Sequence, residues 1–205
     1  MKVSDLIQCA GFPCSDIRTA SYYVTEIELD ADKISIVMIS EASPADLSDQ
    51  YYAGPDSLFL QTTLMAFQDA GLNVGSIEDL LHLGVYLTTA VKCGKTGYAI
   101  NTRTVEACSH LLEKELALFP KAKVYLLMGD VAIRTLNNIA RRAGEKRVIP
   151  GGSTYKLRGQ DYRYQGKKVF PSYLQAGPSF FIEKSKRRMI AEDIAHALQS
   201  VYQSE

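Results

Sequence analysis

The fold is decided by one apolar stretch, Lys33-Ile34-Ser35-Ile36-Val37-Met38-Ile39. The run is short and rich in β-branched residues, which is typical of a strand buried on both faces of a sheet. It leads into the polar segment Ser40-Glu41-Ala42-Ser43-Pro44, which we predict to be a loop. Strands of this kind belong to parallel sheets with helices on both faces.

Similar apolar runs recur outward from this stretch and alternate with helical patterns. Further strands are predicted over residues 85–91, 123–128 and 168–170, and short hairpin strands over 155–158 and 162–164. Helical patterns cover residues 58–70, 76–83, 102–119, 130–142 and 183–202. This alternation predicts an α/β fold. We expect a three-layer αβα fold with a central, mostly parallel four-stranded sheet, which forms a single domain over residues 1–205.

The composition agrees with a globular domain. Hydrophobic residues make up 46% and charged residues 22%, enough to fill a core without disulfides or a metal. We see no apolar run long enough for a signal peptide or a membrane span. We therefore expect a monomer in the cytoplasm, where thiols are kept reduced.

The net charge of zero hides a strong asymmetry. Residues 141–188 contain 13 Lys or Arg against 3 Asp or Glu, and the remaining residues contain 10 against 20. A basic segment of this density is a candidate surface for nucleic acid. The alternative is a solvated basic hairpin that binds nothing.

Four cysteines form two pairs with distinct spacing. Cys9 and Cys14 lie near the N-terminus, Cys93 leaves a predicted strand, and Cys108 lies early in the following helix. Four thiolates suit either a [4Fe–4S] cluster or a tetrahedral zinc ion, and residue type alone does not separate the two. Four unrelated buried cysteines remain the alternative.

The predicted strand ends converge. In parallel sheets of this kind, ligands bind outside the carboxyl ends of the strands. The loops after Ile39, Val91, Met128 and Phe170 should therefore share one rim.

The same loops contain a series of sequence blocks in a fixed order. After the first cysteine pair come residues 40–44, then Thr89-Ala90-Val91-Lys92-Cys93 with Cys108, then residues 127–132, then residues 171–179 before a C-terminal helix. In order and spacing these blocks resemble those of the iron–sulfur (family 4) uracil-DNA glycosylases and their superfamily, over nearly the whole chain.

The resemblance implies roles for several residues. Cys9, Cys14, Cys93 and Cys108 would hold a [4Fe–4S] cluster with a structural or DNA-positioning role. Glu41 would orient water or stabilise positive charge on the sugar. Tyr51 and Tyr52 follow the first loop, near where the family places an aromatic ring that stacks on the flipped base.

The chain departs from the family pattern at two positions. The uracil-reading Asn falls at Thr89, whose hydroxyl cannot present the paired donor and acceptor of an amide. The His that stabilises the departing base falls at Leu174 or Gly177, neither of which donates a hydrogen bond. The chain's histidines, His82, His110 and His196, lie on or beside predicted helices.

Other side chains in these blocks could serve instead. Tyr173 and Gln175 lie in the last motif, and Gln175 offers both a donor and an acceptor. The last helix opens with Lys184, Lys186, Arg187 and Arg188, where backbone amides already favour phosphate.

The sequence therefore predicts a DNA-repair glycosylase that hydrolyses the N-glycosidic bond of a flipped, deaminated base with weak or altered specificity. The alternative is a catalytically inactive iron–sulfur protein of the same fold that binds DNA, RNA or a nucleotide. A third interpretation is a domain stapled by zinc.

Overall fold

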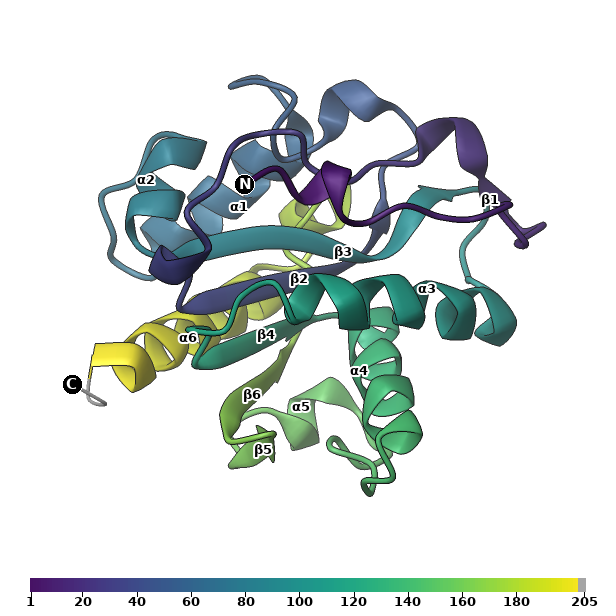
Figure 1. Ribbon diagram of the computed structural model, residues 1–205. Coiled ribbons are helices and arrows are strands. Elements are labelled where there is room, and N and C mark those ends of the chain that lie inside the picture. The colour runs from purple at the N-terminus through teal and green to yellow at the C-terminus, as the bar shows by residue number, and fades with distance from the viewer. Residues whose placement is uncertain (203–205) are drawn as a thin grey trace.

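A six-stranded sheet in the order β1-β3-β2-β4-β6-β5 runs through the computed structural model, which describes residues 1–202 (Figure 1). The strands are β1 (Ile17–Arg18), β2 (Ile36–Ser43), β3 (Val85–Lys95), β4 (Val124–Met128), β5 (Tyr162–Tyr164) and β6 (Lys167–Ser172). The four inner strands are parallel, as predicted. The two edge strands are short, and each is antiparallel to its neighbour. The strand β1 has no apolar run from which it could have been predicted.

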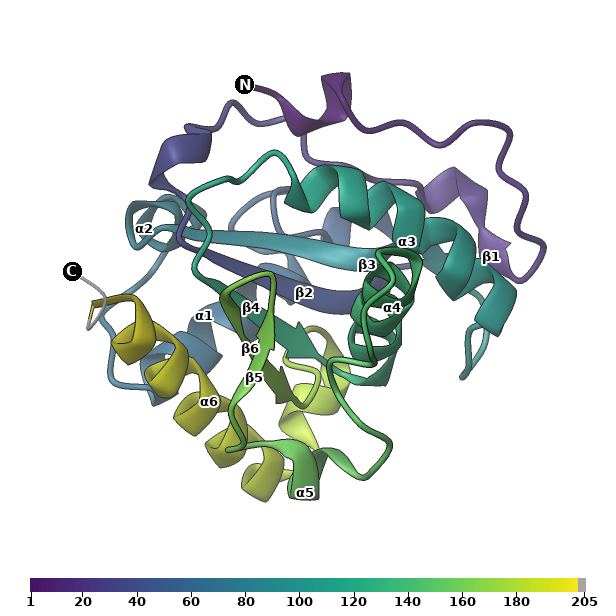
Figure 2. The ribbon, with the colours of Figure 1, turned by 60° about the horizontal axis from the view of Figure 1, so that its bottom comes forward.

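Helices cover both faces of the sheet. They are α1 (Leu58–Asp69), α2 (Ile77–His82), α3 (Thr102–Leu116), α4 (Asp130–Arg142), α5 (Thr154–Leu157) and α6 (Lys184–Tyr202). The pair α3 and α4 packs on one face, and α1, α2 and α6 pack on the other (Figure 2). Alternate residues of β2 enter the two cores: Val37 and Ile39 face α3 and α4, whereas Ile36 and Met38 face the other layer. The predicted αβα layering is confirmed.

Two local predictions are wrong. Residues 40–43 are not a loop but continue β2, because β3 extends beside them and the Ser43 hydroxyl donates to the Ser21 carbonyl at 2.8 Å. Residues 155–158 form no strand: residues 154–157 are the short helix α5, which ends at Arg158. The Arg158 guanidinium donates to the buried carboxylate of Asp193 in α6 at 2.9 Å, and this pair anchors the turn.

The strand β6 also continues through Pro171, where the prediction ended it. Pro171 pairs with Leu127 of β4, while β5 pairs only with residues 167–169 on the other side. A proline is tolerated there because that side of the strand has no ladder partner.

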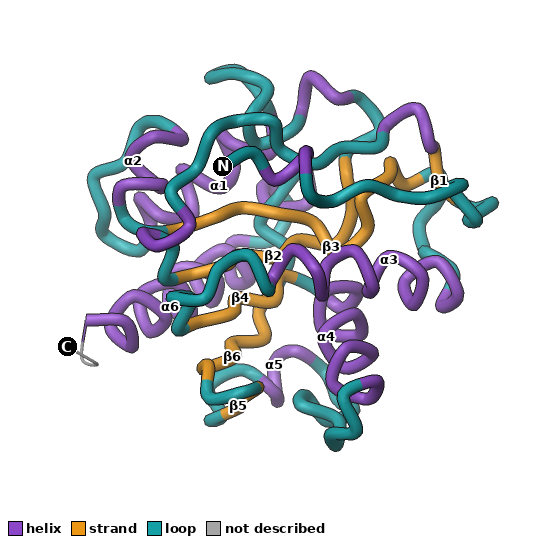
Figure 3. Tube along the Cα trace, viewed as in Figure 1, coloured by secondary structure: helices purple, strands orange, loops and turns teal. Residues whose placement is uncertain are grey.

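The leader, residues 1–35, wraps the α3 side of the molecule, mostly as loop with short helical turns (Figure 3). Val3 and Ile7 are buried in the same core as α3, and Ile17 pairs with Lys95 at the end of β3. The leader thus brings its two cysteines to the edge of β3. Within residues 1–202, no helix is both long and apolar enough to cross a bilayer.

Candidate functional site

The rim at the carboxyl ends of the inner strands encloses a cavity of about 290 Å³, which we call the Glu41 cavity. Its walls come from all four inner strand ends: Glu41 from β2, Tyr98 after β3, Gly129 after β4 and Tyr173 after β6. Phe180, Ile182, Lys186 and Arg187 close it from the α6 side. The predicted convergence of the strand ends is confirmed.

Glu41 is held in place but remains accessible to water. Its side chain is 19% exposed, and one carboxylate oxygen lies 3.7 Å from the Lys95 ammonium. Gly129 has a φ of 101°, and a Cβ atom at that position would lie only 2.7 Å from Glu41 Oε1. Glycine is therefore required for both the backbone conformation and the close approach of the carboxylate. A carboxylate so placed can orient a water molecule and accept its proton.

The basic residues that open α6 divide into two groups. Lys186 and Arg187 line the Glu41 cavity, whereas Lys184 and Arg188 are not among its walls. The Lys186 ammonium lies 5.4 Å from the Tyr173 ring and 2.6 Å from the Glu183 carboxylate. Arg187 donates to Asp69 at 2.8 Å and lies over the Phe180 ring. Nearby acids therefore already engage the cations of the cavity.

Tyr51 and Gln175 are buried behind the rim, and neither lines the Glu41 cavity. Gln175 Nε2 donates to the Tyr51 hydroxyl at 3.1 Å and lies 3.3 Å from the hydroxyls of Ser40 and Thr63. Tyr51 also shares a hydrogen bond with Ser40. These contacts brace the end of β2 against the loop after β6, and Tyr51, which is 1% exposed, does not reach the Glu41 cavity.

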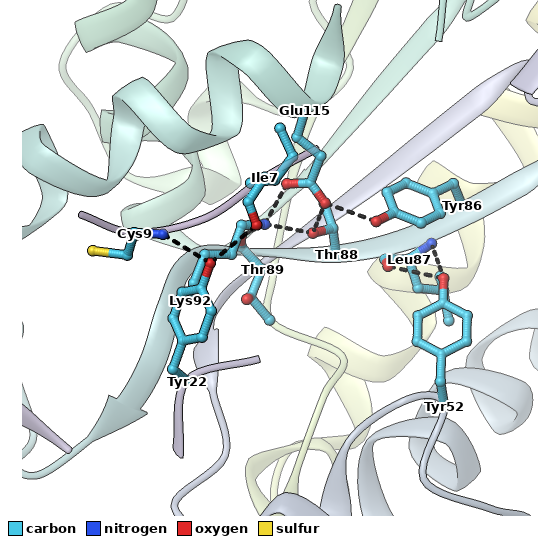
Figure 4. Close-up of polar contacts among 10 residues, drawn as sticks. All are labelled: Ile7, Cys9, Tyr22, Tyr52, Tyr86, Leu87, Thr88, Thr89, Lys92 and Glu115. Atoms are coloured by element: carbon cyan, nitrogen blue, oxygen red, sulfur yellow. Dashed lines mark hydrogen bonds and ion pairs between the residues drawn. The ribbon is translucent and has the colours of Figure 1, made fainter. Parts of the chain in front are cut away.

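Tyr52 and Thr89 also lie away from the Glu41 cavity. The Tyr52 hydroxyl donates to the Leu87 carbonyl at 3.0 Å and accepts from the Leu87 amide at 3.1 Å (Figure 4). Together with Tyr51, it lines a separate cavity of about 390 Å³ beside α2. Thr89 is buried in β3, and its carbonyl accepts a hydrogen bond from the Lys92 ammonium at 2.7 Å.

A buried polar network lies between β3 and α3. It comprises Tyr86, Thr88, Lys92 and Glu115, and we call it the Lys92 network (Figure 4). Lys92 and Glu115 form an ion pair in which each side chain is 1% exposed. The hydroxyls of Tyr86 and Thr88 donate to Glu115 at 2.7 and 2.8 Å, and Lys92 also donates to Thr88 at 2.7 Å. Sequence patterns did not indicate this network.

The backbone of Lys92 connects the network to the cysteines. The Tyr23 amide of the leader donates to the Lys92 carbonyl at 2.8 Å. A backbone hydrogen bond from Lys92 favours the Cys108 thiolate, although burial raises the pKa of that thiol. In the leader, the Cys9 amide donates to the Tyr22 hydroxyl at 3.2 Å.

The four cysteines share one neighbourhood at the edge of β3. Cys9 and Cys14 pack against the core that contains Cys93 and Cys108. Burial raises the pKa of Cys93 to about 12, and the charges of the other three sulfurs add to the rise. Among residues 1–202, however, no group of three or more Cys, His, Asp or Glu side chains is already arranged around a metal position. The thiols fit an iron–sulfur cluster or zinc in their chemistry, and all four sulfurs are near enough to interact electrostatically.

Comparison with known proteins agrees with the αβα fold. The family model described as "Uracil DNA glycosylase superfamily" matches residues 28–195. A type-5 uracil-DNA glycosylase from Thermus thermophilus is 37% identical over 122 residues, which cover 58% of this chain and 52% of that protein. The chain thus matches about half the length of that relative.

Proposed function

Because the chain belongs to the uracil-DNA glycosylase superfamily, we propose that it is a DNA-repair hydrolase that releases a deaminated base at the Glu41 cavity. The observation that carries this proposal is a partly exposed carboxylate in a cavity that all four inner strand ends help to form. The DNA would approach the rim, and the base would leave the stack to enter the cavity.

The chemistry requires one water molecule and one carboxylate. Glu41 orients the water and accepts its proton while the water oxygen bonds to C1′ of the sugar. The bond between C1′ and the base nitrogen breaks, and the base departs with the bonding electron pair and takes up a proton from solvent. Charge on the sugar in the transition state resembles that in glycoside hydrolysis, where a nearby carboxylate stabilises it.

The specificity should be weak or altered. Thr89 is buried, and no histidine is among the walls of the Glu41 cavity, which lie within the described residues. The loss of one donor to a departing anion costs on the order of 100-fold to 1000-fold in rate. We therefore expect slow turnover and a substrate range that differs from that of uracil-specific relatives.

An excision assay tests the proposal. Oligonucleotides with a single uracil, hypoxanthine or xanthine are incubated with the wild-type protein and with Glu41→Ala, whose fold is checked by circular dichroism. We expect slow release of at least one base by the wild type and none by the variant. Equal background for both proteins on all three substrates would overturn the assignment.

Cys9, Cys14, Cys93 and Cys108 are the residues that would hold a [4Fe–4S] cluster. Their common neighbourhood supports this proposal. Such a cluster at this edge would fasten the leader to β3 and α3. The superfamily is established for this chain, whereas its closer grouping with the iron–sulfur family 4 remains part of the proposal, because the relative described above is named type 5.

Metal analysis after anaerobic purification tests the cluster. We expect a brown protein with iron and acid-labile sulfide in equal amounts, and loss of both in Cys108→Ser. If the protein contains zinc and no iron, the four cysteines bind a structural zinc ion and not an iron–sulfur cluster.

A second candidate function is nucleic-acid binding without base release. The absence of a histidine from the cavity walls favours it, since it leaves the departing base without its usual donor. Salt-dependent affinity for DNA or RNA together with negative excision assays would select this function.

A further inference from the structure

Exposed aromatic and aliphatic side chains gather at the mouth of the Glu41 cavity. Within residues 1–202, eight large hydrophobic side chains are exposed, and four of them either line this cavity or directly neighbour, in the sequence, a residue that lines it. We call these four the aromatic lip: Tyr98 is 98% exposed, Ile182 76%, Tyr155 69% and Phe181 53%. Tyr98 and Ile182 line the cavity, Tyr155 follows the lining residue Thr154, and Phe181 lies between the lining residues Phe180 and Ile182. Such a concentration of exposed apolar surface around a cavity marks a binding site.

Tyr98 is directly connected to the reactive end of the cavity. The Lys95 ammonium lies 5.5 Å from the centre of the Tyr98 ring and 3.7 Å from the Glu41 carboxylate. One lysine therefore bridges the outermost ring and the proposed catalytic carboxylate. A base stacked on Tyr98 would lie next to the position where the bond is broken.

The charges around the lip are largely neutralised by neighbours. Lys186 pairs with Glu183 at 2.6 Å, and Arg187 pairs with Asp69 at 2.8 Å. Lys95 pairs with Glu41, the carboxylate inside the cavity. Phosphates would have to compete with these acids, so contacts to the DNA backbone contribute less here than stacking does.

We propose that the aromatic lip stacks unpaired bases, so that single-stranded DNA is the preferred form at this site. The inference rests on the proposed function in that it concerns the same cavity. Stacking on aromatic side chains accepts every base, but it requires base faces that a duplex hides. The lip comes from three separate segments, after β3, in α5 and before α6, and two of these segments supply exposed side chains that line the cavity, Tyr98 and Ile182.

Fluorescence anisotropy with one labelled strand, alone and annealed to its complement, tests the proposal. The proteins are the wild type, Tyr98→Ala, Tyr98→Phe and Tyr202→Ala, the last an exposed tyrosine at the far end of α6. Tyr98→Ala removes one stacking ring and should bind the single strand on the order of 10-fold more weakly than the wild type. Tyr98→Phe and Tyr202→Ala should bind like the wild type, with a shallow dependence on salt.

The outcomes separate this inference from the proposed chemistry. Single-strand preference that Tyr98→Ala abolishes, without any base release, would support the lip and reject the glycosylase. Two results would contradict the stacking role of the aromatic lip while supporting the glycosylase activity. In the first, the protein releases the base but binds both DNA forms with equal affinity. In the second, it releases the base and Tyr98→Ala has no effect on single-strand binding.

Discussion

The strand β3 carries two lysines three residues apart, Lys92 and Lys95, and each forms an ion pair with a glutamate. The two pairs differ in their exposure to solvent and in the hydrogen bonds around them. Lys92 and Glu115 are each 1% exposed and belong to a network in which hydroxyls and a carbonyl complete their hydrogen bonds. Lys95 and Glu41 are 33% and 19% exposed and lie 3.7 Å apart at the Glu41 cavity. The first pair is closed to solvent and substrate, whereas the second is open to both.

The difference shows that one strand, β3, contributes a lysine both to a buried structural ion pair and to an ion pair at the proposed site. A buried charge is tolerated only when it is paired and hydrogen-bonded, and removing its partner is then costly. A half-exposed pair contributes little to stability because water screens it, and so it is available for other work. Lys92 therefore fastens α3 and the leader to β3, while Glu41 remains available for the catalytic role that we propose for it.

The largest expected effect comes from breaking the closed pair. Glu115→Ala leaves the Lys92 ammonium buried without its counter-charge, and we expect a loss of about 3–5 kcal/mol in the free energy of unfolding. Urea denaturation followed by circular dichroism measures it. A loss below about 1 kcal/mol would show that the network is hydrated and not closed.

A double variant is the control for this prediction. Lys92→Met with Glu115→Leu removes both charges and keeps the side-chain volume, so most of the lost stability should return. If the double variant is as unstable as Glu115→Ala, the damage comes from packing and not from the unpaired charge.

A smaller loss of stability is expected from a substitution at Gly129, which follows β4 and lies against Glu41. Gly129→Ala adds a methyl group 2.7 Å from Glu41 Oε1 at a φ of 101°. Gly144→Ala is the matched control, because its φ is 77° but nothing lies within 4 Å of the added atom. Backbone strain costs about 1–3 kcal/mol in both. Only Gly129→Ala should also lower base release, and equal effects of the two variants on release would contradict the geometry.

The smallest effect is expected from the open pair. Lys95→Met removes an ion pair that is partly exposed, and the free energy of unfolding should change by less than about 0.5 kcal/mol. Differential scanning calorimetry of the wild type, Lys95→Met and Glu115→Ala compares the stability of the three proteins. A destabilisation as large as that of Glu115→Ala would abolish the distinction between the two pairs.

Much of the fold could be predicted because its signals are local. Three of the four inner strands, β2, β3 and β4, contain short apolar runs. The helices between the strands show clear periodicity, as in α4 with Ile133, Leu136 and Ile139 on its buried side. The edge strand β1 was missed because two residues carry no pattern. The extension of β2 to Ser43 was missed because the buried hydroxyl of Ser43 is satisfied by the Ser21 carbonyl and the Gln50 amide, and the sequence pattern does not reveal these contacts.

The site could be predicted only in part. Glu41, Tyr173, Lys186 and Arg187 do line the cavity, because strand ends and helix starts place them there. Tyr51 and Gln175 were chosen for their chemistry, but tertiary contacts bury both. The Lys92 network was missed because Glu115 lies 23 residues away from Lys92 and on another element. Sequence distance conceals such pairs.

Glu41 is the proposed catalytic residue of the open pair. The most direct test is the single-turnover rate of base release by the wild type and by Glu41→Gln, which keeps the shape but cannot accept the proton of water. We expect a fall on the order of 100-fold or more, with an unchanged unfolding midpoint. Equal rates for the two folded proteins would show that the reaction does not depend on Glu41 and would contradict the account.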